Sequence, residues 1–310
     1  MSVGDLHIET PLWESAPLSR ALGTEVLLKM EAFQPTGSFK LRGHGAACRA
    51  ARDGGARRVV CSSGGNAGLA VAYASRLLGL DALVVVPHTT PEAMRERIRN
   101  EGGEVLEHGA VWDDAHLRAL ELADQEGTVY VHPFDDPLLW TGHAGLVREV
   151  AAAGRRPQSV VVAVGGGGLL CGVIEGLHAV GWSDVEVVAV ETDGAASFAA
   201  SLAAGALVSL DGITSLATSL GARTVAAEAL AWAERHPVRS WVVSDEAAID
   251  ACVRFARDHR VLVEPACGAA LAAVYERAPA LEERDPVLVV VCGGAGVDLE
   301  RLTAWRASAG

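Results

Sequence analysis

The sequence predicts an α/β fold with mainly parallel sheets, and three observations support that prediction. Short runs rich in β-branched residues alternate with longer, alanine-rich, helix-like segments along all 310 residues, which is the pattern of an α/β protein. The strand-like runs are continuously apolar rather than alternating, as expected for parallel strands covered on both faces. Three of these runs end in glycine-rich turns, a feature typical of ligand sites beyond the carboxyl ends of parallel strands.

The apolar runs give the predicted order of elements. Strands are expected at 26–30, 58–61, 82–86, 104–107, 128–131, 159–163, 185–190, 240–243 and 287–291. Helices are expected between them at 66–78, 92–100, 112–124, 138–153, 169–180, 245–258 and 268–277, with a last helix near 298–309. No internal repeat, low-complexity tract or long linker separates these elements. Any second domain is therefore expected to be inserted into, or closely joined to, the first.

Composition excludes several classes of function. The chain is 50% hydrophobic and 21% charged, which is ordinary for a soluble globular protein. A formal net charge of −13 argues against general binding to nucleic acid or anionic membranes. No apolar run approaches the length of a membrane span, and no secretory signal is visible. The six cysteines are scattered without metal-type spacing, so we expect reduced thiols in a cytoplasmic protein.

The choice of basic residues points to chemistry. Only two of the 26 basic side chains are lysines, Lys29 in an apolar run and Lys40 in the segment QPTGSFKLRG. Arginine replaces lysine wherever a cation suffices, but it cannot supply a neutral amine. Lys40 is therefore a candidate for Schiff-base chemistry with a carbonyl cofactor such as pyridoxal phosphate (PLP). The alternative is an ordinary lysine without a chemical role.

The first glycine-rich turn joins the strand at 58–61 to the following helix. It consists of Ser62, Ser63, Gly64, Gly65 and Asn66. Its hydroxyls and exposed backbone N–H groups could hold a carboxylate, and the amide of Asn66 could donate to a phenolic oxygen. The alternative is a plain strand–helix turn in which Asn66 caps the helix.

The second turn is a run of four glycines, Gly165, Gly166, Gly167 and Gly168, at the start of a helix. Because no Cβ atom obstructs an anion there and the helix dipole favours one, the run is a plausible phosphate cradle. It lacks the Gly-Lys-Ser/Thr ending and the G-x-G-x-x-G spacing of nucleotide sites. A phosphate without a nucleotide is therefore the better prediction, and a tight packing turn is the alternative.

The third turn follows the strand at 287–291 and begins with Cys292. Taken alone, a core cysteine is the favoured interpretation. Together with the lysine, the hydroxyl loop and the glycine run, however, it completes one consistent set. That set describes a site for an aldehyde that carries a phosphate and an aromatic ring.

Six segments resemble the fold-type II PLP enzymes, and among them the L-serine/L-threonine dehydratases and their serine dehydratase-like branch. They are EAFQPTGSFK (31–40), SSGGN (62–66), PFDDP (133–137), GGGGL (165–169), ETDGAASF (191–198) and VEPACGAA (263–270). The resemblance covers nearly the whole chain. Gly64 stands where several relatives have alanine, and in this the chain resembles the dehydratase-like branch. His44 stands where a small or aliphatic residue is usual and is interpreted as structural.

The resemblance implies two domains with open twisted sheets, as in the tryptophan synthase β-subunit, with the cofactor between them. Residues 1–40 and 141–310 would form the large PLP-binding domain, and 41–140 a small inserted α/β domain. A homodimer is implied as well. No regulatory domain follows the last expected helix, so we expect an enzyme without allosteric control.

The resemblance also assigns roles to single residues. Lys40 would carry PLP and later remove the Cα proton, and Phe39 and Ser219 would lie against the two faces of the ring. The remaining cofactor contacts would be Asn66, Gly165, Gly166, Gly167, Gly168, Leu169 and Cys292. The substrate carboxylate would be held by Ser62, Ser63, Gly64, Gly65 and Asn66. A monovalent cation, K⁺ in the first instance, would bind at Glu191, Ala195, Ser197, Leu220 and Ala222, unless Glu191 is a helix-capping or salt-bridging acid.

The implied reaction is PLP-dependent β-elimination from L-serine or L-threonine, giving pyruvate or 2-oxobutanoate and ammonia. Two alternatives share the scaffold. One is β-replacement of the cysteine synthase or cystathionine β-synthase type, and the other is amino-acid racemisation, which would require a second base opposite Lys40. A homologue that binds cofactor without turnover is disfavoured because every motif is complete.

Overall fold

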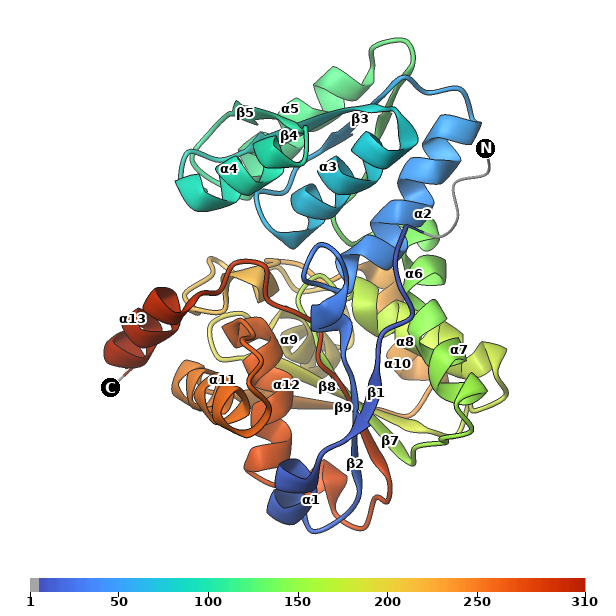
Figure 1. Ribbon diagram of the computed structural model, residues 1–310, viewed down its shortest axis with the longest axis vertical. Helices are drawn as coiled ribbons and strands as arrows, with labels where there is room; N and C mark the ends of the chain where they lie inside the picture. The colour runs from blue at the N-terminus through green and yellow to red at the C-terminus, as the bar shows by residue number, and fades with distance from the viewer. Residues whose placement is uncertain (1–5, 310) are drawn as a thin grey trace. The chain divides into compact units, whose positions relative to one another are not determined.

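The computed structural model describes residues 6–309, which divide into two compact units (Figure 1). One unit comprises residues 6–8 and Gln34–Gly142, and the other comprises Glu9–Phe33 and 143–309. Each unit is a sheet with helices, and the predicted α/β fold is confirmed. None of the described helices is both long enough and apolar enough to cross a membrane.

The first unit is built on a four-stranded parallel sheet in the order β5-β4-β3-β6. Its strands are β3 (Arg58–Cys61), β4 (Asp81–Val86), β5 (Glu104–Glu107) and β6 (Thr128–Tyr130). Its helices are α2 (Lys40–Asp53), α3 (Asn66–Leu78), α4 (Glu92–Asn100), α5 (Trp112–Ala123) and α6 (Pro137–His143), the last of which ends at the unit boundary. Each parallel connection passes through a helix, as it must when neighbouring strands run the same way.

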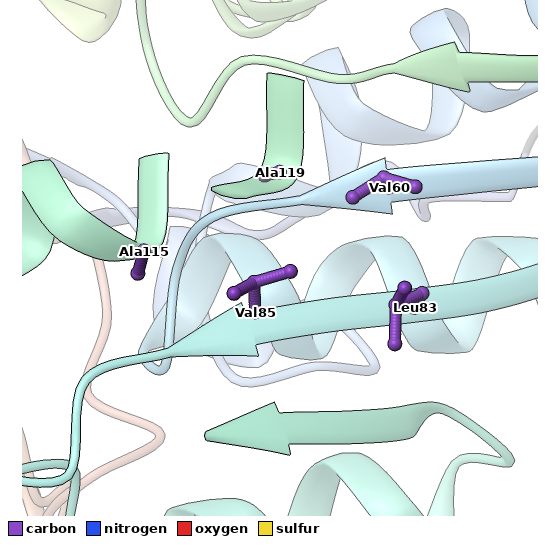
Figure 2. Packing of buried hydrophobic residues seen from close by; sticks show 5 residues of the cluster. All are labelled: Val60, Leu83, Val85, Ala115 and Ala119. Atoms are coloured by element: carbon purple, nitrogen blue, oxygen red, sulfur yellow. The ribbon is translucent and has the colours of Figure 1, made fainter. Parts of the chain in front are cut away.

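One core of this unit lies between its sheet and α5 (Figure 2). Val60, Leu83 and Val85 project from β3 and β4 toward Ala115 and Ala119 of α5. The two alanines lie one helical turn apart and therefore share a face. Their small side chains let α5 approach the sheet closely, and this approach places the polar residues of α5 near the end of β3.

The second unit contains a six-stranded sheet in the order β1-β2-β10-β7-β8-β9, in which only β1 is antiparallel. Its strands are β1 (Leu12–Glu14), β2 (Val26–Lys29), β7 (Ser159–Ala163), β8 (Glu186–Thr192), β9 (Val238–Val243) and β10 (Val287–Val290). Its helices are α1 (Ala16–Leu22), α7 (Gly145–Ala152), α8 (Gly168–Ala179), α9 (Ser197–Ala204), α10 (Ala227–Arg235), α11 (Asp245–His259), α12 (Pro265–Tyr275) and α13 (Leu299–Ala309). Short 3₁₀ helices lie at η1 (Glu31–Phe33), η2 (Thr218–Leu220) and η3 (Pro279–Leu281).

The central strands of this sheet are buried along their whole length, as their continuous apolar sequences predict. Helix α12 is buried on every side and packs against β7, β8, β9 and β10. Its alanines and glycine explain how a helix can be enclosed so completely, because small side chains allow close approach from all directions.

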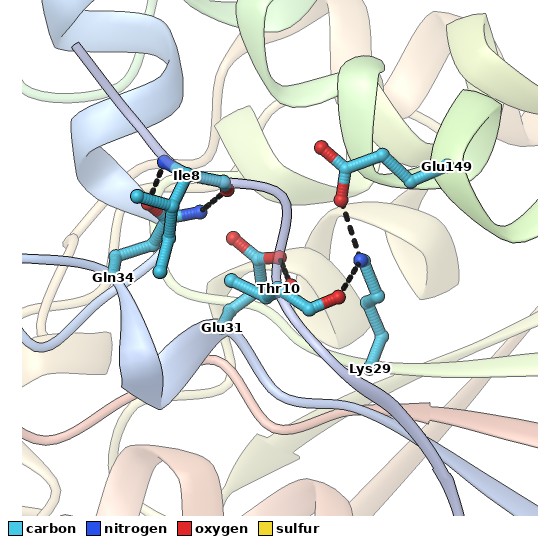
Figure 3. Close-up of polar contacts among 6 residues, drawn as sticks. All are labelled: Ile8, Thr10, Lys29, Glu31, Gln34 and Glu149. Carbon is cyan, nitrogen blue, oxygen red and sulfur yellow. Dashed lines mark hydrogen bonds and ion pairs between the residues drawn. The ribbon is translucent and has the colours of Figure 1, made fainter.

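Lys29 ends β2 with a buried ammonium group that makes two polar contacts (Figure 3). Its Nζ donates to the carbonyl oxygen of Thr10 at 2.6 Å and pairs with the carboxylate of Glu149 at 2.5 Å. The hydroxyl of Thr10 in turn donates to Glu31 at 2.7 Å. A buried charge persists when it is paired and hydrogen-bonded in this way. Lys29 therefore has a structural role in the second unit.

Both sheets reverse their strand order at one place, and these places carry the predicted site residues. In the first unit the chain runs from β3 to β4 and β5 and returns to β6 on the other side of β3. In the second unit it runs from β7 to β8 and β9, and β10 lies on the other side of β7. Ligands of open parallel sheets bind beyond the carboxyl ends of the strands at such a switch point.

Candidate active site

Lys40 is the first residue of α2 and lies at the switch point of the first unit. Its Nζ donates to the carbonyl oxygen of Pro133 at 2.5 Å and lies 5.2 Å from the centre of the Phe39 ring. Pro133 follows β6, the neighbour of β3 in the sheet. The carbonyl of Pro133 therefore fixes the direction of the amine.

Two histidines near Lys40, the buried His44 and the half-buried His132, are neutral. The Nδ1 of His44 donates to the carbonyl oxygen of Lys40 at 2.9 Å, and burial together with the charge of Lys40 lowers the pKa of His44 to about 3. The Nδ1 of His132 accepts the backbone N–H groups of Phe134 and Asp135 at 3.2 and 2.8 Å. Burial, followed by the electrostatic influence of His116 and Lys40, lowers the pKa of His132 to about 3. His44 thus shapes α2, and His132 shapes the turn that presents Pro133.

The predicted carboxylate loop leaves β3 and leads into α3. Ser62 is buried, with its hydroxyl 2.7 Å from that of Tyr130, whereas Ser63 is half-buried. The Ser63 hydroxyl accepts the N–H of Gly65 at 3.4 Å. Helix α3 starts at Asn66, and no side chain in the described part of the chain caps it. The first N–H groups of α3 are therefore suited to an anion.

The glycine run follows β7 at the switch point of the second unit. Gly167 has φ +88°, in the left-handed region that glycine adopts without strain. A Cβ atom on Gly165 would lie 2.9 Å from Cα of Leu220. Helix α8 begins at Gly168, with Leu169 buried in its first turn, and no described side chain caps it. This uncapped, glycine-lined helix N-terminus fits a phosphate.

Ser219 lies beside this run. It is the exposed middle residue of η2, whose next residue, Leu220, packs directly against Gly165. The N–H of Ala226 also donates to the carbonyl of Gly166 at 3.0 Å, which ties the 218–226 segment to the run. The structure therefore brings Ser219 and the predicted phosphate site together within one unit.

Cys292 follows β10, the strand on the other side of the same switch point. Two causes raise the pKa of the Cys292 thiol well above its usual value. The larger is a hydrogen bond with Cys267 of α12, and the second is burial. The group is therefore a neutral thiol. All six cysteines are free. A neutral thiol fits the predicted role of Cys292 as a weak partner for a pyridine nitrogen.

Glu191 caps α9 with both oxygens. They accept the N–H groups of Phe198 and Ala199, each at 2.8 Å. Burial raises the pKa of Glu191 to about 7, although the two N–H groups oppose the shift. The helix-capping alternative is therefore what the structure shows for this carboxylate. The cation at Glu191, Ala195, Ser197, Leu220 and Ala222 stays a prediction.

The residues of each unit fit a different part of PLP. In the second unit, the uncapped start of α8 has N–H groups that would suit the phosphate, and Cys292 has a neutral thiol that would suit the ring nitrogen. In the first unit, the amine of Lys40 would suit the aldehyde, and Asn66 has an amide at the start of α3. None of these groups carries a negative charge, which the phosphate of PLP would repel.

Sequence reasoning missed a cluster of aromatic side chains behind the carboxylate loop. Trp112 and His116 come from α5, and Tyr130 and His132 come from β6 and the turn after it. A signal was present, since an aromatic residue and a histidine precede the PFDDP segment directly. Their partner, the buried Ser62, follows from the pairing of β3 with β6.

Comparison with known proteins agrees with this geometry. The human protein "L-serine dehydratase/L-threonine deaminase" is 48% identical over 320 residues, which cover 100% of this chain and 98% of that protein. The rat protein "Serine dehydratase-like" is 51% identical over 308 residues, which cover 96% of this chain and 93% of that protein. The crystal structure of L-serine ammonia-lyase from Rhizomucor miehei superposes with a TM-score of 0.92 at 39% identity, covering 98% of this chain and 99% of that one.

The sequence model of one family matches residues 3–293, nearly the entire chain. That family is described as pyridoxal-phosphate dependent enzyme, and its cofactor is the one that the lysine, the glycine run and the neutral thiol predict. The match spans both units and ends before α13. The chain belongs to the pyridoxal-phosphate-dependent enzyme family.

Proposed function

We propose that the protein is an L-serine/L-threonine ammonia-lyase, which converts serine to pyruvate and threonine to 2-oxobutanoate with release of ammonia. The observation that carries the proposal is Lys40, whose amine is aimed by the Pro133 carbonyl and has two neutral histidines nearby. The full-length similarity to two proteins named for serine dehydration supports it.

We assign PLP to residues from both units. Lys40, Phe39 and Asn66 from the first unit, and Gly165–Gly168, Leu169, Ser219 and Cys292 from the second, would hold the cofactor. Bound PLP supplies an electron sink for the bonds at the Cα atom of the amino acid. The neutral thiol of Cys292 would leave the pyridine nitrogen of bound PLP largely unprotonated, which would suit elimination better than chemistry through a long-lived carbanion.

The carboxylate loop orients the substrate. Ser63, Gly64 and Asn66, with Ser62 and Gly65 shaping the turn, receive the α-carboxylate at the uncapped start of α3. Fixing the carboxylate places the Cα–H bond before Lys40, and orientation of this kind supplies a large part of the rate. The neutral amine of Lys40 then accepts the Cα proton.

The overall reaction balances without a redox step. The Cα–H and Cβ–O bonds break, water leaves, and the enamine produced is hydrolysed by one water to the 2-oxo acid and ammonia. No acceptor other than water is needed. This distinguishes the proposed reaction from β-replacement, which requires a second nucleophilic substrate.

Three further features belong to the same proposal. A monovalent cation, K⁺ in the first instance, would bind near Glu191, where it would favour the ionised carboxylate. The carbonyl oxygens of Ala195, Leu220 and Ala222 and the oxygens of Ser197 would complete its shell, since hard cations prefer oxygen ligands. We also propose a homodimer and a cytoplasmic location.

The test is release of 2-oxo acid from L-serine, L-threonine and bulkier β-hydroxy amino acids, with K⁺ present. The wild type should produce pyruvate or 2-oxobutanoate, whereas Lys40→Ala should not. Lys40→Arg is the matched variant, because it keeps the cation but not the amine chemistry, and it should be equally inactive. Colour changes on substrate addition without any 2-oxo acid would overturn the dehydratase and direct the search to thiol acceptors or racemisation.

A further inference from the structure

Ser62, the first residue of the carboxylate loop, is contacted by the side chains of Trp112 and Tyr130. The indole N–H of Trp112 donates to the Ser62 carbonyl at 2.6 Å. The Ser62 hydroxyl lies 2.7 Å from the hydroxyl of Tyr130, which lies 2.7 Å from Nδ1 of His116. Ser62 is fully buried. All four residues lie in the first unit.

The local fold explains why these side chains meet. Trp112 and His116 are separated by one turn of α5 and stack with ring centres 4.7 Å apart. Tyr130 ends β6, which pairs with β3, and Ser62 follows β3 directly. Tyr130 also packs on the core shared by β3, β4 and α5. The loop is therefore held by side chains from elements that pack on the core of the unit.

These contacts constrain the loop in two independent ways. A peptide unit is planar, so fixing the carbonyl of Ser62 also fixes the N–H of Ser63 in the same plane. The hydroxyl contact with Tyr130 fixes the Ser62 side chain. Each hydrogen bond is short, and both Trp112 and Tyr130 belong to elements that pack on the core. The loop that follows therefore starts from one defined orientation.

His116 sets the direction of the hydrogen-bond chain. Burial lowers the pKa of His116, against the opposing influence of Asp113, so the ring is neutral near neutral pH. Burial likewise raises the pKa of Tyr130, which keeps the phenol protonated. In the tautomer of neutral His116 that carries its proton on Nε2, Nδ1 accepts from Tyr130, and the oxygen of Tyr130 accepts the Ser62 proton.

We propose that Trp112, Tyr130 and His116 are positioning residues, which hold the carboxylate loop in the shape that recognises the α-carboxylate of the substrate. This inference rests on the proposed function, because it takes the loop at 62–66 as the carboxylate site. The three residues act through Ser62 and not through the cofactor. Their removal should therefore weaken recognition of the carboxylate and leave recognition of the amine unchanged.

Two ligands separate these effects in the PLP-loaded enzyme. L-Alanine and ethylamine both present an amine to the cofactor, differ by the carboxylate, and lack a β-hydroxyl that could be eliminated. Their affinities can be measured from the cofactor absorbance. The dissociation constant of ethylamine divided by that of L-alanine reports the contribution of the carboxylate to binding. The difference in basicity between the two amines is the same for every variant and cancels when variants are compared.

We expect Trp112→Phe and Tyr130→Phe each to reduce this ratio by about tenfold, the effect of losing one well-placed hydrogen bond in a site that binds a charged group. The affinity for ethylamine should stay within about twofold of the wild type. Tyr73→Phe is the matched control, since Tyr73 lies on α3 with its ring against Arg76, and it should leave the ratio unchanged. Equal weakening of both ligands, or an unchanged ratio in both variants, would overturn the proposal.

A double-mutant cycle gives a second, independent test. In a Ser62→Ala background, Tyr130→Phe and His116→Phe should have no further effect on the ratio, because their path to the loop runs through the Ser62 hydroxyl. An effect of the same size in both backgrounds would refute that path. Release of 2-oxo acid from serine, measured on the same wild-type preparation, tests the proposed function separately.

Discussion

Thr90 lies directly against Gly64 of the carboxylate loop. A Cβ atom on Gly64 would stand 2.5 Å from Cγ2 and 2.6 Å from Oγ1 of Thr90, closer than such atoms approach one another in proteins. Thr90 is itself buried. Its side chain therefore cannot move aside without disturbing its own surroundings, and the two residues form a size-matched pair.

Gly64→Ala is expected to destabilise the protein by about 1–3 kcal/mol, as overpacking of a tight site does. It should also raise KM for serine, because the loop must shift. Adding Thr90→Ala removes both close atoms and leaves only the Thr90 Cβ at 3.1 Å. The double variant should then recover most of the stability in urea unfolding. A single variant as stable as the wild type would contradict the pairing.

His132→Asn should reduce the dependence of the free energy of unfolding on pH in the acidic range. The pKa of His132 is about 3 in the folded protein against an ordinary 6.5. Between these values the unfolded chain binds a proton that the folded chain does not, so stability falls as pH falls from about 6.5 toward 3. The asparagine oxygen can accept the same N–H groups as Nδ1 of His132 without titrating. Urea unfolding at several pH values measures the slope.

The matched control for that experiment is His108→Asn, because His108 is an exposed histidine of the same unit. It should leave the slope of stability against pH unchanged. A His132→Asn variant whose slope equals that of the wild type between pH 6.5 and 4 would show that His132 titrates normally.

The stability of Glu191→Gln relative to that of the wild type should increase as pH rises. The pKa of Glu191 is raised from 4.5 to about 7 by burial. The cost of ionising it is therefore absent below about pH 4.5, grows between 4.5 and 7, and is complete above 7, at roughly 3 kcal/mol. Comparing melting temperatures at pH 5 and pH 8 isolates this cost, since the lost capping bond is common to both.

K⁺ provides the second readout for Glu191. If a cation binds near this carboxylate, added K⁺ should stabilise the wild type at pH 8 and have a smaller effect on Glu191→Gln. N-methylglucamine chloride at equal ionic strength is the control. The same response to K⁺ in both proteins would place any cation elsewhere.

Lys29→Met should destabilise the fold by about 3 kcal/mol or more, because it leaves the carboxylate of Glu149 without its cation in a largely buried place. Adding Glu149→Leu should recover part of this loss. The purified Lys29→Met enzyme should still bind PLP and release 2-oxo acid, since the structure places Lys29 in a separate network. Loss of cofactor binding in a folded Lys29→Met protein would contradict that separation.

The buried parallel strands were predictable because burial on both faces leaves an uninterrupted apolar signature. The segments at 58–61 and 159–163 correspond to β3 and β7 residue for residue. Strand β1 was missed, since three residues that include a tryptophan and a glutamate carry no pattern. The single helix expected at 138–153 is in fact α6 and α7, which divide at Ala144.

The strand–helix turns were equally predictable, because glycine runs mark sites where a backbone must approach a neighbour or a ligand. What sequence could not supply was the order of strands in each sheet. That order puts β6 beside β3 and so brings Tyr130 to Ser62. It also puts β10 beside β7 and so brings Cys292 to the side of the glycine run. The capping contacts of Glu191 depend on the local geometry at the start of α9, which the sequence did not reveal, and its role as a cation ligand stays a prediction.

The two lysines differ in accessibility as well as in role. Lys29 is 1% exposed and locked in an ion pair, whereas Lys40 is only partly buried. Apart from the α-amino group, the chain therefore offers chemical reagents a single reachable amine. A fluorescent aldehyde or an activated ester, which would label most proteins at many positions, can here react with Lys40 and the α-amino group, and of these two amines only Lys40 would be shielded by the cofactor. The number of labels acquired before and after cofactor loading would count active sites directly.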